Sequence, residues 1–388
     1  MELNVDADRL TNDLIAMVNI PSVNRFGEND PANPAEEPMA DYFGEQLKQL
    51  GLVVDTQEVA DGRHNVWGTL KGSANGPTIL LAGHLDTVGI DAYDKPFEAY
   101  VHQGRVYGRG SCDMKAGLAV YLEVVRMIIE SGQPLRGDLI VAGVVDEEHA
   151  MIGSAEFGNS RPAVDFAIVA EPSSLAISPA HKGQVCLSIK TTGRSVHSSV
   201  AHLGVNAIYH MTSVMLALQK YADDLSLRPP DPMCGNPSFS IGVITGGQNA
   251  SSVPDHCEIT VDRRTVPGES YESVMGELTD ILDGVAASIP EFNYEFSAPS
   301  LNVPPLNTSR RSPLFEALYE SVEAVQGKPP SVVPFPGSTD APNFNVPAVI
   351  CGAGALAQCH SLDEYVPVDE MISAVQIYLQ TIYKLQSV

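Results

Sequence analysis

The chain has 388 residues, of which 44% are hydrophobic and 18% charged, and its formal net charge is −25 at pH 7. This length and composition indicate a globular protein of about two domains, and the negative charge repels phosphate backbones, which argues against nucleic acid as a partner. No apolar run approaches the roughly 20 residues that a bilayer span needs, and the acidic N-terminus has no apolar signal segment, so we expect a cytoplasmic protein without a membrane partner.

The first part of the chain predicts alternating helices and strands. Amphipathic stretches that stop at proline or glycine predict helices, because proline breaks a helix interior and glycine commonly follows a helix end. Short, continuously apolar runs predict strands that are buried on both faces. The alternation indicates an α/β layer with a parallel or mixed sheet. The predicted helices are 7–20, 36–50 and 116–129, and the predicted buried strands are 78–82, 138–145 and one from Phe166.

The pattern changes from about Gly183. The next segments alternate as half-exposed strands and amphipathic helices in the order β-α-β-β-α-β, which is the ferredoxin-like split unit. The α/β pattern then returns in the C-terminal part. We therefore predict one α/β domain at 1–182 and 301–388, interrupted by an inserted α+β domain at 183–300.

His84 and Asp86 lie two residues apart at the end of a predicted buried strand, so their side chains project on the same face. A carboxylate beside a histidine fixes the tautomer of the ring and raises its basicity, an arrangement that metal sites use. The alternative is an incidental polar strand end.

Further carboxylates lie beside other predicted elements. Asp113 lies in a glycine-rich turn before a helix, where aspartate is also a common N-cap residue. Asp146, Glu147 and Glu148 follow a buried strand, and neighbours on a strand point to opposite sides. One of the two glutamates would then bind a metal while the other addresses water or substrate; a solvated acidic loop is the alternative.

Glu171 ends another predicted strand, and His360 lies in the C-terminal segment. With the residues above, they lie at the mouth of an α/β sheet, where ligands bind. Two histidines and three carboxylates suit zinc, cobalt or manganese. Five ligands are too many for one tetrahedral ion but suit two ions that share a carboxylate. Such a pair, roughly 3.5–4 Å apart, clamps an attacking water and stabilises the oxyanion.

The chain also resembles the two-zinc metallopeptidase family that includes acetylornithine deacetylase, succinyl-diaminopimelate desuccinylase, aminoacylase and related carboxypeptidases. The resemblance covers nearly the whole chain. It implies a zinc-exopeptidase-like catalytic domain with an inserted ferredoxin-like lid or dimerisation domain, and a homodimer. Seven motifs carry it in the family's order: GHLDTV, GRGSCDMKAG, DEEHAMIGS, AEPSS, GRSVHSS, VDRRTVPG and AQCHSLDEYV.

By this resemblance, His84 and Glu171 bind one zinc ion. Glu148 and His360 bind the second, and Asp113 bridges the two ions. The chain therefore matches the family at every metal ligand.

The resemblance also implies roles for residues outside the ligand set. Asp86 would orient the first histidine, and Glu147 would be the general base that transfers a proton from water to the leaving amine. His197, which in dimeric relatives reaches in from the other subunit, would help to hold the oxyanion. Arg264 is a candidate clamp for a substrate carboxylate, unless carboxylates of the inserted domain pair with it. Thr339 lies in a run that resembles a substrate-contacting loop, and by sequence alone it is a turn.

One departure concerns the substrate site. The family usually carries asparagine in the stretch that reads GGQNASSVP here, where Ser251 takes that place and Asn249 precedes it by two residues. Serine is shorter and offers no amide, so this contact with substrate is in doubt.

These observations predict a metal-dependent hydrolase that cleaves the amide bond of an N-acyl amino acid, with two Zn²⁺ per chain and Co²⁺ or Mn²⁺ as other suitable ions. A dipeptidase or carboxypeptidase of the same family would use the same ions and base. A non-catalytic binding protein would be indicated by loss of Glu147 or of a ligand, and neither is lost. A protein that binds or stores a single metal ion is another alternative, and the metal content per chain distinguishes it from a two-metal enzyme.

Overall fold

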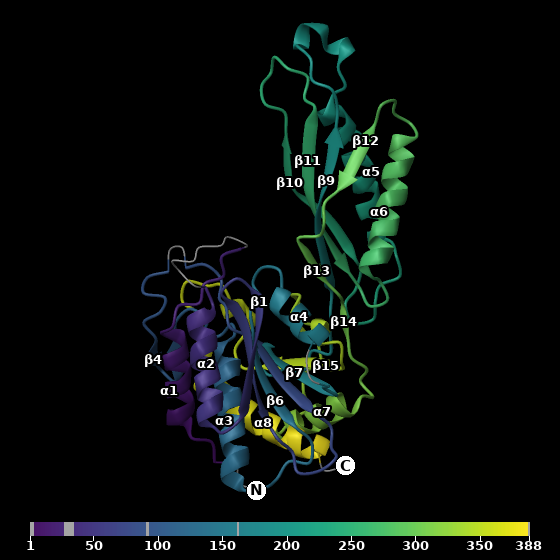
Figure 1. The fold of residues 1–388 in the computed structure, drawn as a ribbon. Helices are drawn as coiled ribbons and strands as arrows, with labels where there is room; N and C mark the ends of the chain where they lie inside the picture. The colour runs from purple at the N-terminus through teal and green to yellow at the C-terminus, as the bar shows by residue number, and fades with distance from the viewer. Residues whose placement is uncertain (1–3, 27–34, 91–92, 161–162, 387–388) are drawn as a thin grey trace. The chain divides into compact units, whose positions relative to one another are not determined.

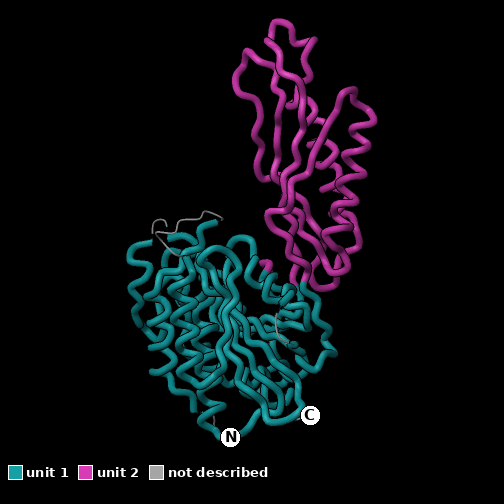
Figure 2. The backbone as a smooth tube through the Cα atoms, in the orientation of Figure 1, with its two compact units in different colours: residues 1–180, 306–335, 339–388 teal, residues 181–305, 336–338 magenta. Residues whose placement is uncertain are grey.

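The computed structural model describes residues 4–26, 35–90, 93–160 and 163–386, and the chain divides into two units (Figures 1 and 2). The first unit contains Met1–Ala180, Leu306–Phe335 and Thr339–Val388, and the second contains His181–Pro305 and Pro336–Ser338. The second unit is thus inserted into the sequence of the first.

A six-stranded sheet organises the first unit, in the order β1-β2-β6-β3-β7-β15. The four strands from β6 to β15 are parallel, whereas β1 and β2 run antiparallel to their neighbours. The carboxyl ends of the parallel strands therefore meet at one edge of the sheet. The strands are β1 (Val53–Ala60), β2 (Arg63–Leu70), β3 (Ile79–His84), β6 (Leu139–Val144), β7 (Phe166–Pro172) and β15 (Ala348–Gly352).

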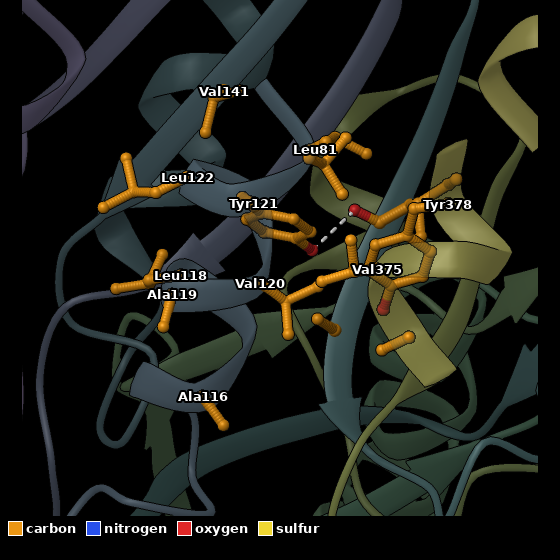
Figure 3. Close-up of a cluster of buried hydrophobic side chains, with 14 of the residues drawn as sticks. Leu81, Ala116, Leu118, Ala119, Val120, Tyr121, Leu122, Val141, Val375 and Tyr378 are labelled. Carbon is orange, nitrogen blue, oxygen red and sulfur yellow. Dashed lines mark hydrogen bonds between the residues drawn. The ribbon is translucent and has the colours of Figure 1, made fainter. Parts of the chain in front are cut away.

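Helices cover both faces of this sheet, which explains why its central strands are continuously apolar. Along β3, Leu81 belongs to a cluster with α1, α2, α3, α7 and α8, whereas Leu80 belongs to a cluster with α4 and η2. Figure 3 shows part of the first cluster, with Leu118, Tyr121 and Leu122 of α3. The helices are α1 (Ala7–Val18), α2 (Glu37–Gln49), α3 (Lys115–Ser131), α4 (Ile152–Ser160), α7 (Pro313–Gln326), α8 (Val368–Gln386) and the 3-10 turn η2 (Ala341–Phe344).

The second unit contains a five-stranded antiparallel sheet in the order β10-β11-β9-β12, with β13 also paired to β9, and it has its own hydrophobic core. Its elements follow each other as β-α-β-β-α-β, the predicted order. Two short segments, η1 (Ser198–Leu203) and β13 (Leu301–Val303), add to this unit. The main elements are β9 (Gly183–Thr192), α5 (Ala207–Ser226), β10 (Ser238–Gly246), β11 (His256–Thr265), α6 (Tyr271–Ala286) and β12 (Asn293–Phe296).

The remaining elements are short. One three-stranded sheet has the order β16-β5-β4, and β14 pairs with β8. None of the helices in the described part of the chain is both long and apolar enough to cross a bilayer. The short elements are β4 (Tyr100–His102), β5 (Arg105–Tyr107), β8 (Ala180–His181), β14 (Leu306–Asn307), η3 (Leu356–Gln358) and β16 (Tyr365–Pro367).

Candidate metal centre

The five predicted metal ligands lie at one edge of the sheet in the first unit. His84 is the last residue of β3, and Glu171 lies near the end of β7. Glu148 follows β6, because that strand ends at Val144. The other two ligands come from loops, one before α3 and one between β15 and β16. The topology of parallel strands therefore gathers side chains from distant parts of the sequence.

The carboxylate of Asp113 lies between the two histidines. Its Oδ1 is 3.1 Å from Nε2 of His84, and its Oδ2 is 3.4 Å from Nε2 of His360. Each oxygen thus faces a different imidazole. The alternative role of Asp113 as a helix cap is wrong, because the N-cap residue of α3 is Met114 and its side chain makes no cap hydrogen bond.

One more carboxylate completes each half of the cluster. Glu171 Oε1 is 3.8 Å from Nε2 of His84, and Glu148 Oε2 is 3.2 Å from Nε2 of His360. The ligand atoms form two trios, each within 4.8 Å, and Asp113 belongs to both. Among the described residues, the buried Oε1 atoms of Glu148 and Glu171 have no hydrogen-bond partner. A buried carboxylate oxygen without a donor is costly, and cations at the two trios would satisfy both, so the donor set fits a pair of metal ions.

Glu147 and Glu148 turn toward the same side of the site. One carboxylate oxygen of Glu147, one of Glu148 and a ring nitrogen of His84 all lie within 4.8 Å of one another. Our expectation that these neighbours point to opposite sides is therefore wrong. Its premise was an extended strand, but Asp146 has a φ of 71° and the two glutamates lie in the turn that follows β6.

Asp86 fixes both the first histidine and this turn. Its backbone carbonyl lies 3.0 Å from Nδ1 of His84, which places the proton on Nδ1 and leaves the Nε2 lone pair free for a metal in the neutral ring. Its carboxylate accepts the backbone N–H groups of Glu147 at 3.2 Å and Glu148 at 3.1 Å. Asn24 donates to the same carboxylate at 2.7 Å. This fully buried aspartate therefore positions a ligand and both glutamates together.

The crowding of carboxylates shifts their proton affinities. Burial raises the pKa of Glu147 well above its usual value, and repulsion by Glu171 adds to the shift. Burial likewise raises the pKa of Glu148 to about 7. Hydrogen bonds to Asp113 and Glu148 raise the pKa of His360 to about 10. Without metal, these three side chains therefore hold protons at neutral pH. They must lose those protons to act as metal ligands or as a base.

Zinc binding is consequently expected to release protons at pH 7 and to become tighter as the pH rises from 7 to 10. His360 is protonated at pH 7 because its pKa is about 10, and Glu148 is partly protonated because its pKa is about 7. Both must lose protons to bind a metal. Calorimetric titration in two buffers of different ionisation enthalpy measures the release, and a binding enthalpy independent of the buffer would contradict it.

His197 lies in the second unit, where it is exposed and caps η1: its Nδ1 accepts the backbone N–H of Ser199 at 3.2 Å. The departure at Ser251 lies beside it, because the carbonyl of Ser251 accepts the backbone N–H of Ser198 at 2.9 Å. The side-chain oxygen of the exposed Asn249 accepts the backbone N–H of Ser251 at 3.0 Å. This departure from the family pattern therefore lies next to the residue implied to hold the oxyanion.

The other two predicted substrate residues already have protein partners. Arg264 is paired with Asp262, with Nε 3.0 Å from Oδ1, and also donates to Ser338 Oγ at 3.3 Å. The side chain of Arg264 remains 33% exposed. Thr339 is buried, and its hydroxyl accepts the N–H of Ala341 at 3.2 Å. The contacts of Arg264 and Thr339 with a substrate stay predictions.

Two buried acidic residues of the site have no role in the sequence-based scheme. Asp340 is 1% exposed, and burial raises its pKa to about 7. The charge of His84 lowers this pKa, and the charge of Asp86 raises it. Glu364 is fully buried and hydrogen bonds to the loop that carries Asp113. Asp340 immediately follows Thr339, and Glu364 lies four residues after His360. Their position in motifs that already held candidate site residues was the only sequence signal for them.

Comparisons with known proteins give consistent results. Residues 80–384 match the model of peptidase family M20/M25/M40. The chain is 30% identical over 372 residues to an acetylornithine deacetylase of Vibrio atlanticus (strain LGP32), covering 94% of this chain and 96% of the relative. It is 31% identical over 342 residues to an acetylornithine deacetylase of Proteus mirabilis (strain HI4320), covering 86% of each.

The fold is similar to solved structures at lower sequence identity. Aminopeptidase PepT from Bacillus cereus ATCC 10987 matches with a TM-score of 0.77 and 20% identity over 98% of this chain and 99% of that chain. The YXEP protein of Bacillus subtilis, described as a dinuclear metal binding peptidase, matches with a TM-score of 0.72 and 16% identity over 98% of both chains. These structures share the α/β fold with the inserted unit.

Proposed function

Because this chain belongs to peptidase family M20/M25/M40, we propose that it is a two-zinc amidohydrolase that cleaves the acyl-amide bond of an N-acyl amino acid. Its family and its cluster of metal-ligating side chains make it a metal-dependent hydrolase. The similarity to acetylornithine deacetylases over most of the chain supports an N-acyl amino acid as the substrate class.

The observation that carries the proposal is the position of Asp113 between the two histidines. One oxygen faces His84 and the other faces His360, so the carboxylate is placed to be shared by two ions. We assign one zinc ion to His84, Asp113 and Glu171. We assign the other to Asp113, Glu148 and His360. The donors would also suit Co²⁺ or Mn²⁺.

When bound, the two ions lower the pKa of a water and act as Lewis acids on the acyl carbonyl. Glu147 is the carboxylate that neither assigned ligand set requires. It takes a proton from the attacking water and delivers it to the amine nitrogen as the C–N bond breaks. Asp86 holds Glu147 in place through its backbone N–H. The chain thus separates the general base from the metal ligands, although the two glutamates are neighbours in the sequence.

Two of the proposed substrate contacts, Arg264 and His197, come from the second unit. Asp262, a carboxylate of that unit, already pairs with Nε and Nη2 of Arg264, so Arg264 binds the substrate carboxylate through the N–H groups of its guanidinium that Asp262 leaves available. His197 holds the oxyanion, and its exposed ring is available to do so. In this scheme the inserted unit is the lid and dimerisation domain, and the first unit is the catalytic domain.

The test is turnover of a substrate panel by zinc-loaded protein, with a chelator as control. The panel contains N-acetylornithine, N-succinyl-diaminopimelate, other N-acyl amino acids and several dipeptides. We expect deacylation that the chelator abolishes and that added Zn²⁺ restores. Cleavage of dipeptides alone would keep the metal site but replace the proposed substrate class by a peptidase. Deacylation that the chelator leaves unchanged would contradict the metal mechanism.

The second unit also supports a homodimer. β10 is an end strand of its sheet and is largely exposed, with Val243 and Ile244 at 53% and 52%. The neighbouring helix α5 exposes Tyr209 and Leu216 at 72% and 63%. A long apolar edge strand is a template for pairing with another chain, and a two-fold axis would pair β10 with its own copy. The proposed partner is therefore a second copy of this chain.

Replacement of Val243 by aspartate is expected to convert the proposed dimer to a monomer, because it would place a charge from each copy in the paired apolar strands. Sedimentation or light scattering measures the molar mass. The matched control is Val53→Asp, since Val53 is 56% exposed on β1, an end strand of the other sheet. Dissociation by the control, or a dimer that survives Val243→Asp, would refute pairing through β10.

A further inference from the structure

Glu364 accepts hydrogen bonds along the whole loop that precedes α3. Its Oε1 accepts the backbone N–H groups of Cys112 at 2.8 Å and Asp113 at 3.0 Å. Its Oε2 accepts from the N–H of Gly110 at 3.1 Å and from Nη1 of Arg109 at 2.6 Å. The side chain is fully buried. One carboxylate therefore accepts hydrogen bonds from three backbone N–H groups of this loop and from one cation.

The backbone of Glu364 adds to this attachment. Its carbonyl oxygen accepts the N–H of Gly108 at 3.1 Å and the hydroxyl of Ser111 at 3.3 Å. The loop contains Gly110 at a φ of 83°, a conformation that favours glycine. Glu364 therefore contacts this loop through both its side chain and its backbone.

The two segments joined by Glu364 carry the two ligands that face each other. The backbone N–H of Asp113 donates directly to the carboxylate of Glu364, and His360 lies four residues before Glu364 on the other segment. Asp113 Oδ2 and His360 Nε2 lie 3.4 Å apart. An alternative role for Glu364 is simply to neutralise the buried Arg109. That role would explain only one of the four hydrogen bonds to the carboxylate, because the other three come from the backbone of the loop that carries Asp113.

We propose that Glu364 is a positioning residue of the metal centre, which holds the loop of Asp113 at the distance from His360 that binding of both ions requires. The inference rests on the proposed function, because it takes Asp113 as the shared ligand. Residues that orient metal ligands typically change metal affinity by about 10–100-fold when they are replaced.

The test compares Glu364→Gln with Glu123→Gln in the full-length protein. A glutamine at 364 can present its oxygen to only one of the two donor pairs, and its NH₂ group then opposes the other pair. Glu123 is an equally buried carboxylate of α3 that is paired with Arg9 at 2.8 Å, but it is not part of the site. Both variants lose a buried charge next to an arginine, and only one of them contacts the loop of Asp113.

Co²⁺ is the probe, because its visible spectrum reports coordination. We expect Glu364→Gln to bind Co²⁺ about 10–100-fold more weakly than wild type, with an altered spectrum, whereas Glu123→Gln keeps wild-type affinity and spectrum. Competition with a chromophoric chelator gives the affinities, and circular dichroism shows that each variant is folded. Equal Co²⁺ affinities and spectra for the two variants would overturn the proposal.

A second variant, Glu364→Asp, keeps the proposal testable if Glu364→Gln does not fold. Glu364→Asp keeps the charge but is too short to reach both donor pairs, and we expect the same loss of affinity. If neither variant folds while Glu123→Gln does, Glu364 serves the fold and the proposal fails. Failure of the proposed function looks different, because wild-type protein itself would then bind fewer than two Co²⁺ ions.

Discussion

Replacement of Glu147 by glutamine is expected to lower kcat by about 10²–10⁴-fold, the range typical of a general acid–base residue, without changing the metal content. Glutamine has nearly the same shape but cannot accept the proton of the attacking water. The backbone N–H of residue 147 still donates to Asp86, so the turn keeps its conformation. Both metal trios that share Asp113 remain intact, because Glu147 belongs to neither.

Glu148→Gln is the matched control, since it makes the same chemical change one residue away, also with a backbone bond to Asp86. This variant is expected to lose affinity for the ion on the side of His360. Steady-state kinetics and metal analysis after dialysis separate the two outcomes. Loss of metal from Glu147→Gln together with retained metal in Glu148→Gln would reverse the assigned roles.

Replacement of Asp113 by asparagine is expected to lower the metal content from the two proposed ions per chain to one or none, and to abolish turnover. An amide has one oxygen, so it can face only one of the two histidines, and it turns its NH₂ group toward the other. The backbone N–H that Glu364 binds is unchanged. The loop should therefore keep its position while the shared ligand is lost.

Thermal melting provides an independent measurement of this loss. An ion at about 100 times its Kd stabilises a folded protein by about 2.7 kcal/mol, so zinc should raise the melting temperature of wild type much more than that of Asp113→Asn. Glu171→Gln is the comparison, because Glu171 belongs to only one of the two trios that share Asp113, and one ion should remain. Asp113→Asn with two tightly bound ions would show that the carboxylate is not shared.

The longer strands and most helices could be predicted because burial leaves a periodic record in the sequence, whereas α4 and the short strands such as β4, β5 and β16 were missed. The sheet is covered on both faces, so β3 and β6 read as continuous apolar runs, and α7 and α8 read as amphipathic helices. The β-α-β-β-α-β order of the inserted unit follows from the same periodicities. Element ends were displaced by one or two residues, as at α1, which ends at Val18 instead of residue 20.

The directions of side chains outside regular structure could not be predicted in this way. Glu147 and Glu148 were expected on opposite sides because a strand was extended past its true end at Val144. The positive φ of Asp146 turns the chain there, and no hydrophobic pattern reports such a turn. Alternation is informative only while the backbone stays extended.

The sequence by itself determined which residue types are candidate ligands, the motifs in which they lie and the sheet that carries them, because these depend on residue chemistry and local periodicity. Only the tertiary structure decided that Asp113 lies between His84 and His360, and that Asn24 and Glu364 support the site. An asparagine or a buried glutamate has no periodic signature, since its role is defined by the groups that it meets. Those groups come from distant segments, and only the packing of parallel strands brings them to one edge.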